Sequence, residues 1–154
     1  MGRKTDNDSR VIATRLAKLI PAFYLMFYVV AGVFIMAYDL EYCGTLPFEH
    51  AKFGDSSSRG KAAVATTILA FAFSPLLMLV LVKSSSNAWD YIATLTLLHI
   101  ALTALVSLSW PSNWKWWLTT LLMALFTTVV SELINYLAEL RRTAKVADAL
   151  NGPA

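Results

Sequence analysis

Four polar side chains stand inside long apolar stretches of the sequence, where they could do chemistry that lipid-facing residues could not. They are Asp90, His99, Glu132 and Asn135. Such side chains are costly in lipid and usually face the interior of a helix bundle. An imidazole and a carboxylate that meet there can form a hydrogen bond or an ion pair. Each then favours the charged form of the other, while burial disfavours both charged forms.

We predict that His99 and Glu132 form this intramembrane pair. Along a helix, His99 lies about 13 Å beyond Asp90, and Glu132 lies about 10–13 Å before the end of its own stretch. The short connection 109–115 favours antiparallel neighbouring helices, which would place both side chains at one depth, with Asn135 one turn nearer the surface. The pair could hold two helices together, relay protons or ions, or line a partner's pocket. A relay normally needs ionisable groups at successive depths, and the first two apolar stretches contain none.

The rest of the sequence offers little for catalysis. The segment 54–62 resembles a phosphate-binding loop, but five residues rather than four separate Gly54 from Gly60, and Ala62 stands where a magnesium-binding hydroxyl is needed. We interpret it as a flexible polar loop. Cys43 is the only cysteine, so it cannot form an internal disulfide. We find no nucleophile–base pair and no metal-ligand spacing, and we expect neither a cofactor nor enzymatic activity.

The elements that must position these side chains are four apolar stretches of about 20 residues each, which is enough for a helix to cross the hydrocarbon core of a bilayer. Hydrophobic residues make up 57% of the chain and charged residues 15%. The sequence therefore predicts an all-α fold, a polytopic membrane protein with one four-transmembrane-helix bundle over residues 1–154. The predicted spans are 19–38, 62–82, 88–108 and 116–137.

The distribution of lysine and arginine predicts that both termini are cytosolic. One side would carry the basic segment 1–18, Lys83 and the tail 138–154, and the other side the two remaining loops. The first side holds Arg3, Lys4, Arg10, Arg15, Lys18, Lys83, Arg141, Arg142 and Lys145, against Lys52, Arg59, Lys61 and Lys115 on the second. The net charge of +3 comes without a basic face interleaved with aromatics, so we expect no nucleic-acid partner.

Aromatic residues at the predicted span ends indicate an interfacial belt, with ligand stacking as the alternative. The belt residues are Tyr38, Tyr42, Trp110, Trp114, Trp116 and Trp117 on the lumenal side, and Trp89 and Tyr91 on the cytosolic side. Before the first span, apolar residues such as Leu16 share one helical face and Arg10, Thr14 and Lys18 another. This pattern fits either a short helix on the cytosolic leaflet or an extension of the first span.

Pro75 lies inside the second predicted span. A proline there removes one backbone hydrogen bond and frees the carbonyl of Phe71. We expect a kink, and kinks in membrane bundles are more often fixed features of shape than hinges.

From Trp89 onward the sequence resembles the Sys-one family of Golgi membrane proteins. Ser131 departs from the family, which usually has glycine before the glutamate. Phe48, Gly54 and Arg59-Gly60 are also similar, more loosely. The positions that carry the resemblance are Asp90 followed by Tyr91, then Thr94, His99, Pro111, the pair Trp116-Trp117, and Glu132.

The resemblance implies a four-span protein of the late Golgi that recruits an ARF-related small GTPase. The acetylated N-terminal segment of that GTPase would dock on the protein, which would support vesicle traffic between endosomes and Golgi. Both termini and the 83–87 loop would face the cytosol, where the GTPase resides. Candidate partner-binding or structural residues are Asp90, Thr94, Trp116, Trp117 and Asn135.

Two functions therefore compete. The first is a membrane receptor or scaffold for a cytosolic trafficking protein. The second is a small proton- or solute-transporting protein that uses the His99–Glu132 pair as a polar path. Four helices are few for a monomeric transporter, and the sequence shows no internal repeat of the kind common in transporters.

Overall fold

The computed structural model describes residues 9–82 and 88–150, with side chains up to residue 146. Its elements are helix α1 (Ser9–Ala37), the short 3-10 helix η1 (Leu46–Phe48), α2 (Ser58–Leu77), the π-helix η2 (Met78–Val82), α3 (Ala88–Ser107) and α4 (Trp114–Leu150). Four helices are long and apolar enough to cross a membrane, and no strand occurs in the described ranges. The predicted all-α fold with four candidate spans is confirmed.

The helix boundaries follow the predicted spans in the middle of the chain and exceed them at both ends. α3 ends one residue before the prediction, and α2 with η2 ends at the predicted Val82. α1 begins at Ser9 and runs unbroken to Ala37, so the described part of the basic segment, residues 9–18, extends the first span rather than forming a separate helix. α4 runs on to Leu150, well past the predicted end at residue 137. Lys83 and the rest of the 83–87 loop lie outside the described residues.

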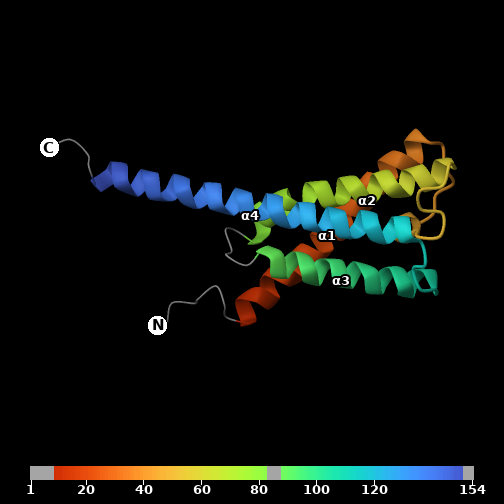
Figure 1. Cartoon of the computed structure of the whole chain (residues 1–154), viewed down its shortest axis with the longest axis horizontal. Coiled ribbons are helices and arrows are strands. Elements are labelled where there is room, and N and C mark those ends of the chain that lie inside the picture. The colour runs from red at the N-terminus through yellow and green to blue at the C-terminus, as the bar shows by residue number, and fades with distance from the viewer. Residues whose placement is uncertain (1–8, 83–87, 151–154) are drawn as a thin grey trace.

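The helices form a bundle in which α2 packs against α1 and α4, and α4 also packs against α3 (Figure 1). The starts of α1 and α3 and the end of η2 lie at one end of the bundle, which we call the terminal end. Residues 38–57 with η1, and the connection 108–113, lie at the opposite end, which we call the loop end. α4 projects past the other helices at the terminal end (Figure 1).

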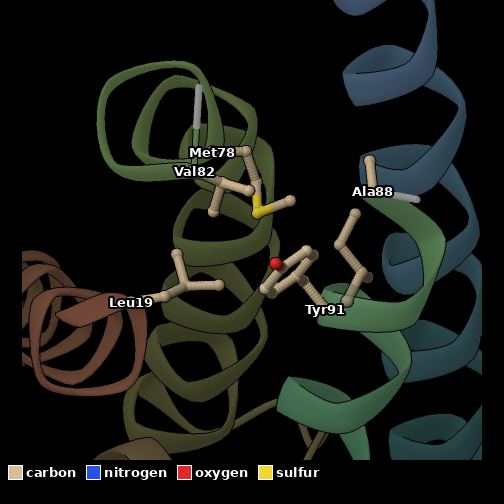
Figure 2. Packing of buried hydrophobic residues seen from close by; sticks show 6 residues of the cluster. Leu19, Met78, Val82, Ala88 and Tyr91 are labelled. Carbon is tan, nitrogen blue, oxygen red and sulfur yellow. The ribbon is translucent and has the colours of Figure 1, made fainter. Parts of the chain in front are cut away.

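Buried apolar side chains fill the bundle along its whole length. Near the terminal end, Leu19 of α1, Met78 and Val82 of η2, and Tyr91 of α3 point toward one another (Figure 2). Phe23, Phe27, Ala70, Phe71 and Leu95 fill the middle, and Leu46, Phe53, Ala62 and Trp116 are among those that fill the loop end. Large apolar side chains such as Leu25, Leu97 and Leu105 lie exposed outside. An exterior this apolar suits contact with lipid tails rather than water.

Pro75 changes the backbone where the sequence predicts an irregularity. The α-helical part of α2 ends at Leu77, and the wider π-helix η2 follows at once. The freed carbonyl oxygen of Phe71 accepts a hydrogen bond of 2.8 Å from the Oγ1 of Thr127 on α4. Because that hydroxyl also lies 2.8 Å from the Met123 carbonyl, its single proton is shared between two acceptors. The proline thus creates a polar contact between two helices.

Candidate functional site

His99 lies at the centre of a cage of aromatic rings, which we call the His99 cage. Its side chain is fully buried on the inner face of α3. The rings come from α1, η1, α2 and α4, and their centroids lie 5.3 to 6.4 Å from that of the imidazole. Phe27, Phe48 and Trp116 stack on the imidazole, Tyr24 is tilted to it, and Phe23 and Phe71 meet it edge on. The cage therefore ties four segments of the chain to one side chain.

The predicted hydrogen bond between His99 and Glu132 is not formed. Neither ring nitrogen of His99 has a hydrogen-bond partner among the described residues. His99 lies eight residues before the end of α3, whereas Glu132 lies eighteen residues after the start of α4. Measured from the loop end, these depths are about 12 Å and about 27 Å. The prediction took the depth of Glu132 from the end of the apolar stretch. In the structure α4 continues past that end, and Glu132 lies level with the start of α3 rather than with His99.

The other polar candidates do not gather around His99. Glu132 and Asn135 are half-buried on α4, nearer the terminal end. Asp90 is exposed in the first turn of α3, where a carboxylate interacts favourably with the helix dipole. Thr94 is exposed too, and its hydroxyl donates to the Asp90 carbonyl oxygen at 2.8 Å. Asp90 and Thr94 thus face outward, contrary to the expectation that polar residues in the spans face the interior.

The tryptophans and tyrosines at the span ends have different roles. Trp110 and Trp114 are 69% and 67% exposed at the loop end, as the belt requires. Trp116 is fully buried and belongs to the His99 cage, and Tyr91 is buried near the terminal end beside Leu19 and Met78, so the belt assignment was wrong for both. Trp117 is half-buried, and its indole nitrogen donates to the Pro111 carbonyl oxygen at 2.7 Å. The indole therefore holds the connection 108–113 against the start of α4.

Two buried threonines on α3 form a polar stripe together with His99. Neither was predicted from the sequence. Thr96 and Thr103 stand three and four residues from His99, so all three side chains share one helical face. Both hydroxyls are buried without a hydrogen-bond partner in the described part of the chain. Ser107 continues the line toward the loop end. The spacing of these residues indicates such a stripe, but threonine is common in membrane helices, so the residue type alone does not indicate a buried polar site.

A second histidine, His50, forms a polar cluster at the loop end. Its Nε2 lies 3.0 Å from the Ser107 Oγ and 3.1 Å from the Ser109 Oγ. Ser107 donates its own proton to the carbonyl oxygen of Thr103 or Ser109, so its Oγ is left to accept from Nε2–H. His50 lines a cavity of about 250 Å³ with Thr45, Phe48, Glu49, Ala51, Val106 and the two serines. His50 escaped notice because it lies in a loop and outside the apolar stretches.

Next to this cavity, Cys43 sits among polar groups that stabilise its thiolate. Its sulfur lies 2.8 Å from the Thr45 hydroxyl, and the Arg59 guanidinium reaches the same hydroxyl at 3.4 Å. Hydrogen bonds from Thr45 and Arg59 lower the pKa of the Cys43 thiol from an ordinary value of 9.0 to about 7. Arg59 also pairs with Glu49, with 3.0 Å between Nε and Oε2. The arrangement ties residues 43–49 to the start of α2.

The glycines of the segment 54–62 serve packing rather than phosphate binding. Gly54 adopts a left-handed conformation with φ +75° beside the Lys115 side chain, a backbone shape that favours glycine. Gly60 lies in the first turn of α2, where a β-carbon would come within 2.4 Å of the Lys52 carbonyl oxygen. Its amide donates to the side chain of the capping residue Ser57 at 3.1 Å. The segment 54–62 therefore forms the start of α2, and its backbone packs closely against the loop that precedes it.

At the terminal end, cations line an open cleft of about 310 Å³ between the start of α1 and the end of η2. Arg10, Arg15 and Lys18 come from successive turns of α1 and Leu81 from η2, with Val11 and Thr14 completing the wall. Positive charge at a membrane surface attracts anionic headgroups and acidic proteins. In the described residues, no group of three or more His, Cys, Asp or Glu side chains could hold a metal ion.

A family model described as integral membrane protein S linking to the trans Golgi network, SYS1, matches residues 2–144. The match confirms the resemblance, which covers roughly residues 19–145 and is most specific from Trp89 onward, and extends it to residue 2. Comparison with curated proteins and with solved structures gave no match.

Proposed function

Because this chain belongs to the SYS1 family, integral membrane proteins linked to the trans Golgi network, we propose that it recruits an ARF-related small GTPase to Golgi membranes. Membership implies a Golgi membrane protein of the trafficking machinery. The recruitment step is our proposal: the chain would be a receptor or scaffold on which the acetylated N-terminal segment of the GTPase docks. It would thereby support vesicle transport between endosomes and Golgi.

The observation that carries this proposal is the family match over nearly the whole chain. The charge distribution supports the orientation it needs. Arg10, Arg15 and Lys18 on α1 lie at the terminal end, and the extension of α4 with Arg141 and Arg142 projects from it. The loop end carries fewer cations, namely Lys52, Arg59, Lys61 and Lys115. The excess of cations at the terminal end favours a cytosolic position for it under the positive-inside rule.

The described residues also support binding more than transport. The transporter alternative depended on a buried His99–Glu132 pair, and this pair is not formed. Without it, His99 is an imidazole enclosed by rings, about 15 Å from Glu132 along the bundle. A receptor needs only a rigid body that holds a surface in the cytosol, and the filled core provides one.

Reconstitution tests the proposal directly. The purified full chain is placed in phosphatidylcholine vesicles, and flotation scores the ARF-related GTPase in its acetylated and unacetylated forms. We expect the acetylated GTPase to float with protein-bearing vesicles, and the unacetylated form and protein-free vesicles to serve as controls. In cells, deletion of the protein should release the GTPase from Golgi membranes to the cytosol. A GTPase that stays on Golgi membranes in the deletion, and does not float with the vesicles, refutes recruitment.

A further inference from the structure

Helix α4 is longer than a membrane crossing requires. From Trp114, about 20 residues at ~1.5 Å per residue cross the ~30 Å hydrocarbon core, which places the far boundary near Ile134. α4 continues to Leu150 and contains neither proline nor glycine, so nothing in its sequence bends it back onto the membrane surface. Figure 1 shows this part of α4 beyond the other helices. We call residues 133–146 the α4 extension.

One face of the α4 extension is apolar and uncovered. Leu133, Leu137, Leu140 and Ala144 recur at spacings of four, three and four residues, which places them on a single face, as in the seam of a coiled coil. Leu137 and Leu140 are 45% and 47% exposed, so nearly half of the surface of each remains open. Of these residues, Leu137, Leu140 and Ala144 lie past the boundary near Ile134, and exposed apolar side chains outside the hydrocarbon core commonly mark sites of protein contact.

The charges beside this stripe indicate which partner fits it. Arg141 and Lys145 stand four residues apart along one edge of the stripe, and both are exposed. Arg142 lies next to them, with its Nη1 4.0 Å from the Oε2 of Glu139. Residues 133–146 carry three cations against one carboxylate, Glu139, so two copies of this helix side by side would repel one another by their net charge. A helix with acidic residues along the facing edge would meet opposite charges instead.

We propose that the α4 extension docks an amphipathic helix of a cytosolic partner. The apolar face of the partner helix covers Leu137 and Leu140, and its acidic residues meet Arg141 and Lys145. This is the helix-in-groove type of recognition, with apolar anchors one turn apart and charges that set orientation and specificity. The inference locates the recruitment proposed above, and it rests on that proposed function for the identity of the partner.

The test uses the full chain in phosphatidylcholine nanodiscs and two synthetic helical probes, each with leucines along one face. One probe carries glutamates beside that face and the other lysines. We expect the acidic probe to bind in fluorescence anisotropy, more weakly as salt rises, and the basic probe not to bind. Leu137→Ser with Leu140→Ser should weaken binding about tenfold or more, because central anchors carry most of the binding energy. Arg141→Glu with Lys145→Glu should reverse the preference between probes.

Val146→Ser is the matched control. Val146 is more exposed than these leucines, at 59%, but projects from the opposite face of the extension, so its loss should leave binding unchanged. All variants should melt at the temperature of the parent chain, because the substituted side chains are exposed. Equal binding of both probes, or full binding to the double serine variant, overturns the proposal. A chain that is dimeric in detergent and becomes monomeric in that variant assigns the face to a second copy and also overturns it.

The two proposals fail in different ways. If the GTPase is released from Golgi membranes on deletion but is still recruited by the double serine variant, recruitment stands and the docking surface is wrong. If the acidic probe binds as expected, but the GTPase neither floats with the vesicles nor leaves Golgi membranes on deletion of the protein, the docking surface stands and the proposed partner is wrong.

Discussion

His99 lies where a polar side chain is costly, yet the described structure gives neither ring nitrogen a hydrogen-bond partner. A neutral imidazole still carries one N–H, and the surrounding rings can receive it only through weak N–H···π contacts. The enclosed ring does gain from stacking on Phe27 and Trp116. Since an unsatisfied buried polar group costs about 1–3 kcal/mol, the contribution of His99 to stability comes from its shape and aromatic surface.

Replacing His99 by leucine should therefore cost little. Leucine has a similar volume and leaves no polar atom unsatisfied, so we expect a change within about 1 kcal/mol in the free energy of unfolding, followed as the melting temperature in detergent. His50→Leu is the contrasting variant, because its Nε2 bonds Ser107 and Ser109, and it should lose about 1–2 kcal/mol. The reverse order of stabilities would mean that His99 has a polar partner. Loss of GTPase recruitment in a stable His99→Leu chain would make the histidine functional.

Cys43 offers a pH-dependent readout of the loop end. Because Thr45 and Arg59 lower the pKa of the thiol to about 7, the reactive thiolate should predominate above that pH. The rate of alkylation by iodoacetamide, measured against pH, should rise through a midpoint near pH 7. Thr45→Val removes the hydroxyl and should move the midpoint upward. A midpoint near the ordinary value of 9.0 in the parent chain would show that these hydrogen bonds are not made in solution.

Gly60 is the glycine whose replacement should be most damaging. A β-carbon there would lie 2.4 Å from the Lys52 carbonyl oxygen and 3.0 Å from two Asp55 backbone atoms, so the loop must move. We expect Gly60→Ala to cost about 1–3 kcal/mol of stability in thermal unfolding, the usual range for overpacking. Gly44→Ala is the control, because a β-carbon at Gly44 would have no neighbouring atom within 4 Å and the φ angle there is not positive. Equal melting temperatures for the two variants would refute the close approach.

At the scale of elements, Pro75 and Thr127 should act as one unit. Thr127→Val removes the donor to the Phe71 carbonyl and should cost about 0.5–2 kcal/mol, whereas Thr128→Val, whose hydroxyl bonds only within α4, should cost less. Pro75→Ala restores a backbone N–H that can bond Phe71 within α2. In that background Thr127→Val should lose most of its effect, a non-additivity that a double-mutant cycle of unfolding free energies measures. Additive losses would show that the two residues act independently.

Most of the fold could be predicted from the sequence because lipid imposes it. An apolar run must be helical and must end where charge or loop residues begin, so the α3 boundaries were nearly right. The freed Phe71 carbonyl was also predictable, but its donor was not, since Thr127 is identified only once α2 and α4 are known to touch. The His99–Glu132 pair failed for a related reason: relative depth depends on where α4 crosses its neighbours, and α4 runs past the end of its apolar stretch.

At the scale of the whole molecule, the four crossings set which surfaces can meet a cytosolic partner. Cys43 lies at the loop end and the α4 extension projects from the terminal end, so the two should face opposite sides of the membrane. Cys43 is the only cysteine in the chain, which makes a thiol label specific to one side. Labelling therefore tests the orientation on which both proposals depend.

In sealed Golgi vesicles with the cytosolic face outward, a membrane-impermeant maleimide should leave Cys43 unmodified until detergent opens the vesicles. A Cys43→Ser chain that carries Ala144→Cys should react before detergent is added, because Ala144 is exposed on the α4 extension. The positive-inside rule gives the reason: Arg10, Arg15 and Lys18 on α1 and Arg141, Arg142 and Lys145 on α4 belong to the terminal end, and cations near span ends are retained in the cytosol. The opposite labelling pattern would place the α4 extension in the lumen, out of reach of any GTPase, and both the recruitment and the docking surface would then be excluded together.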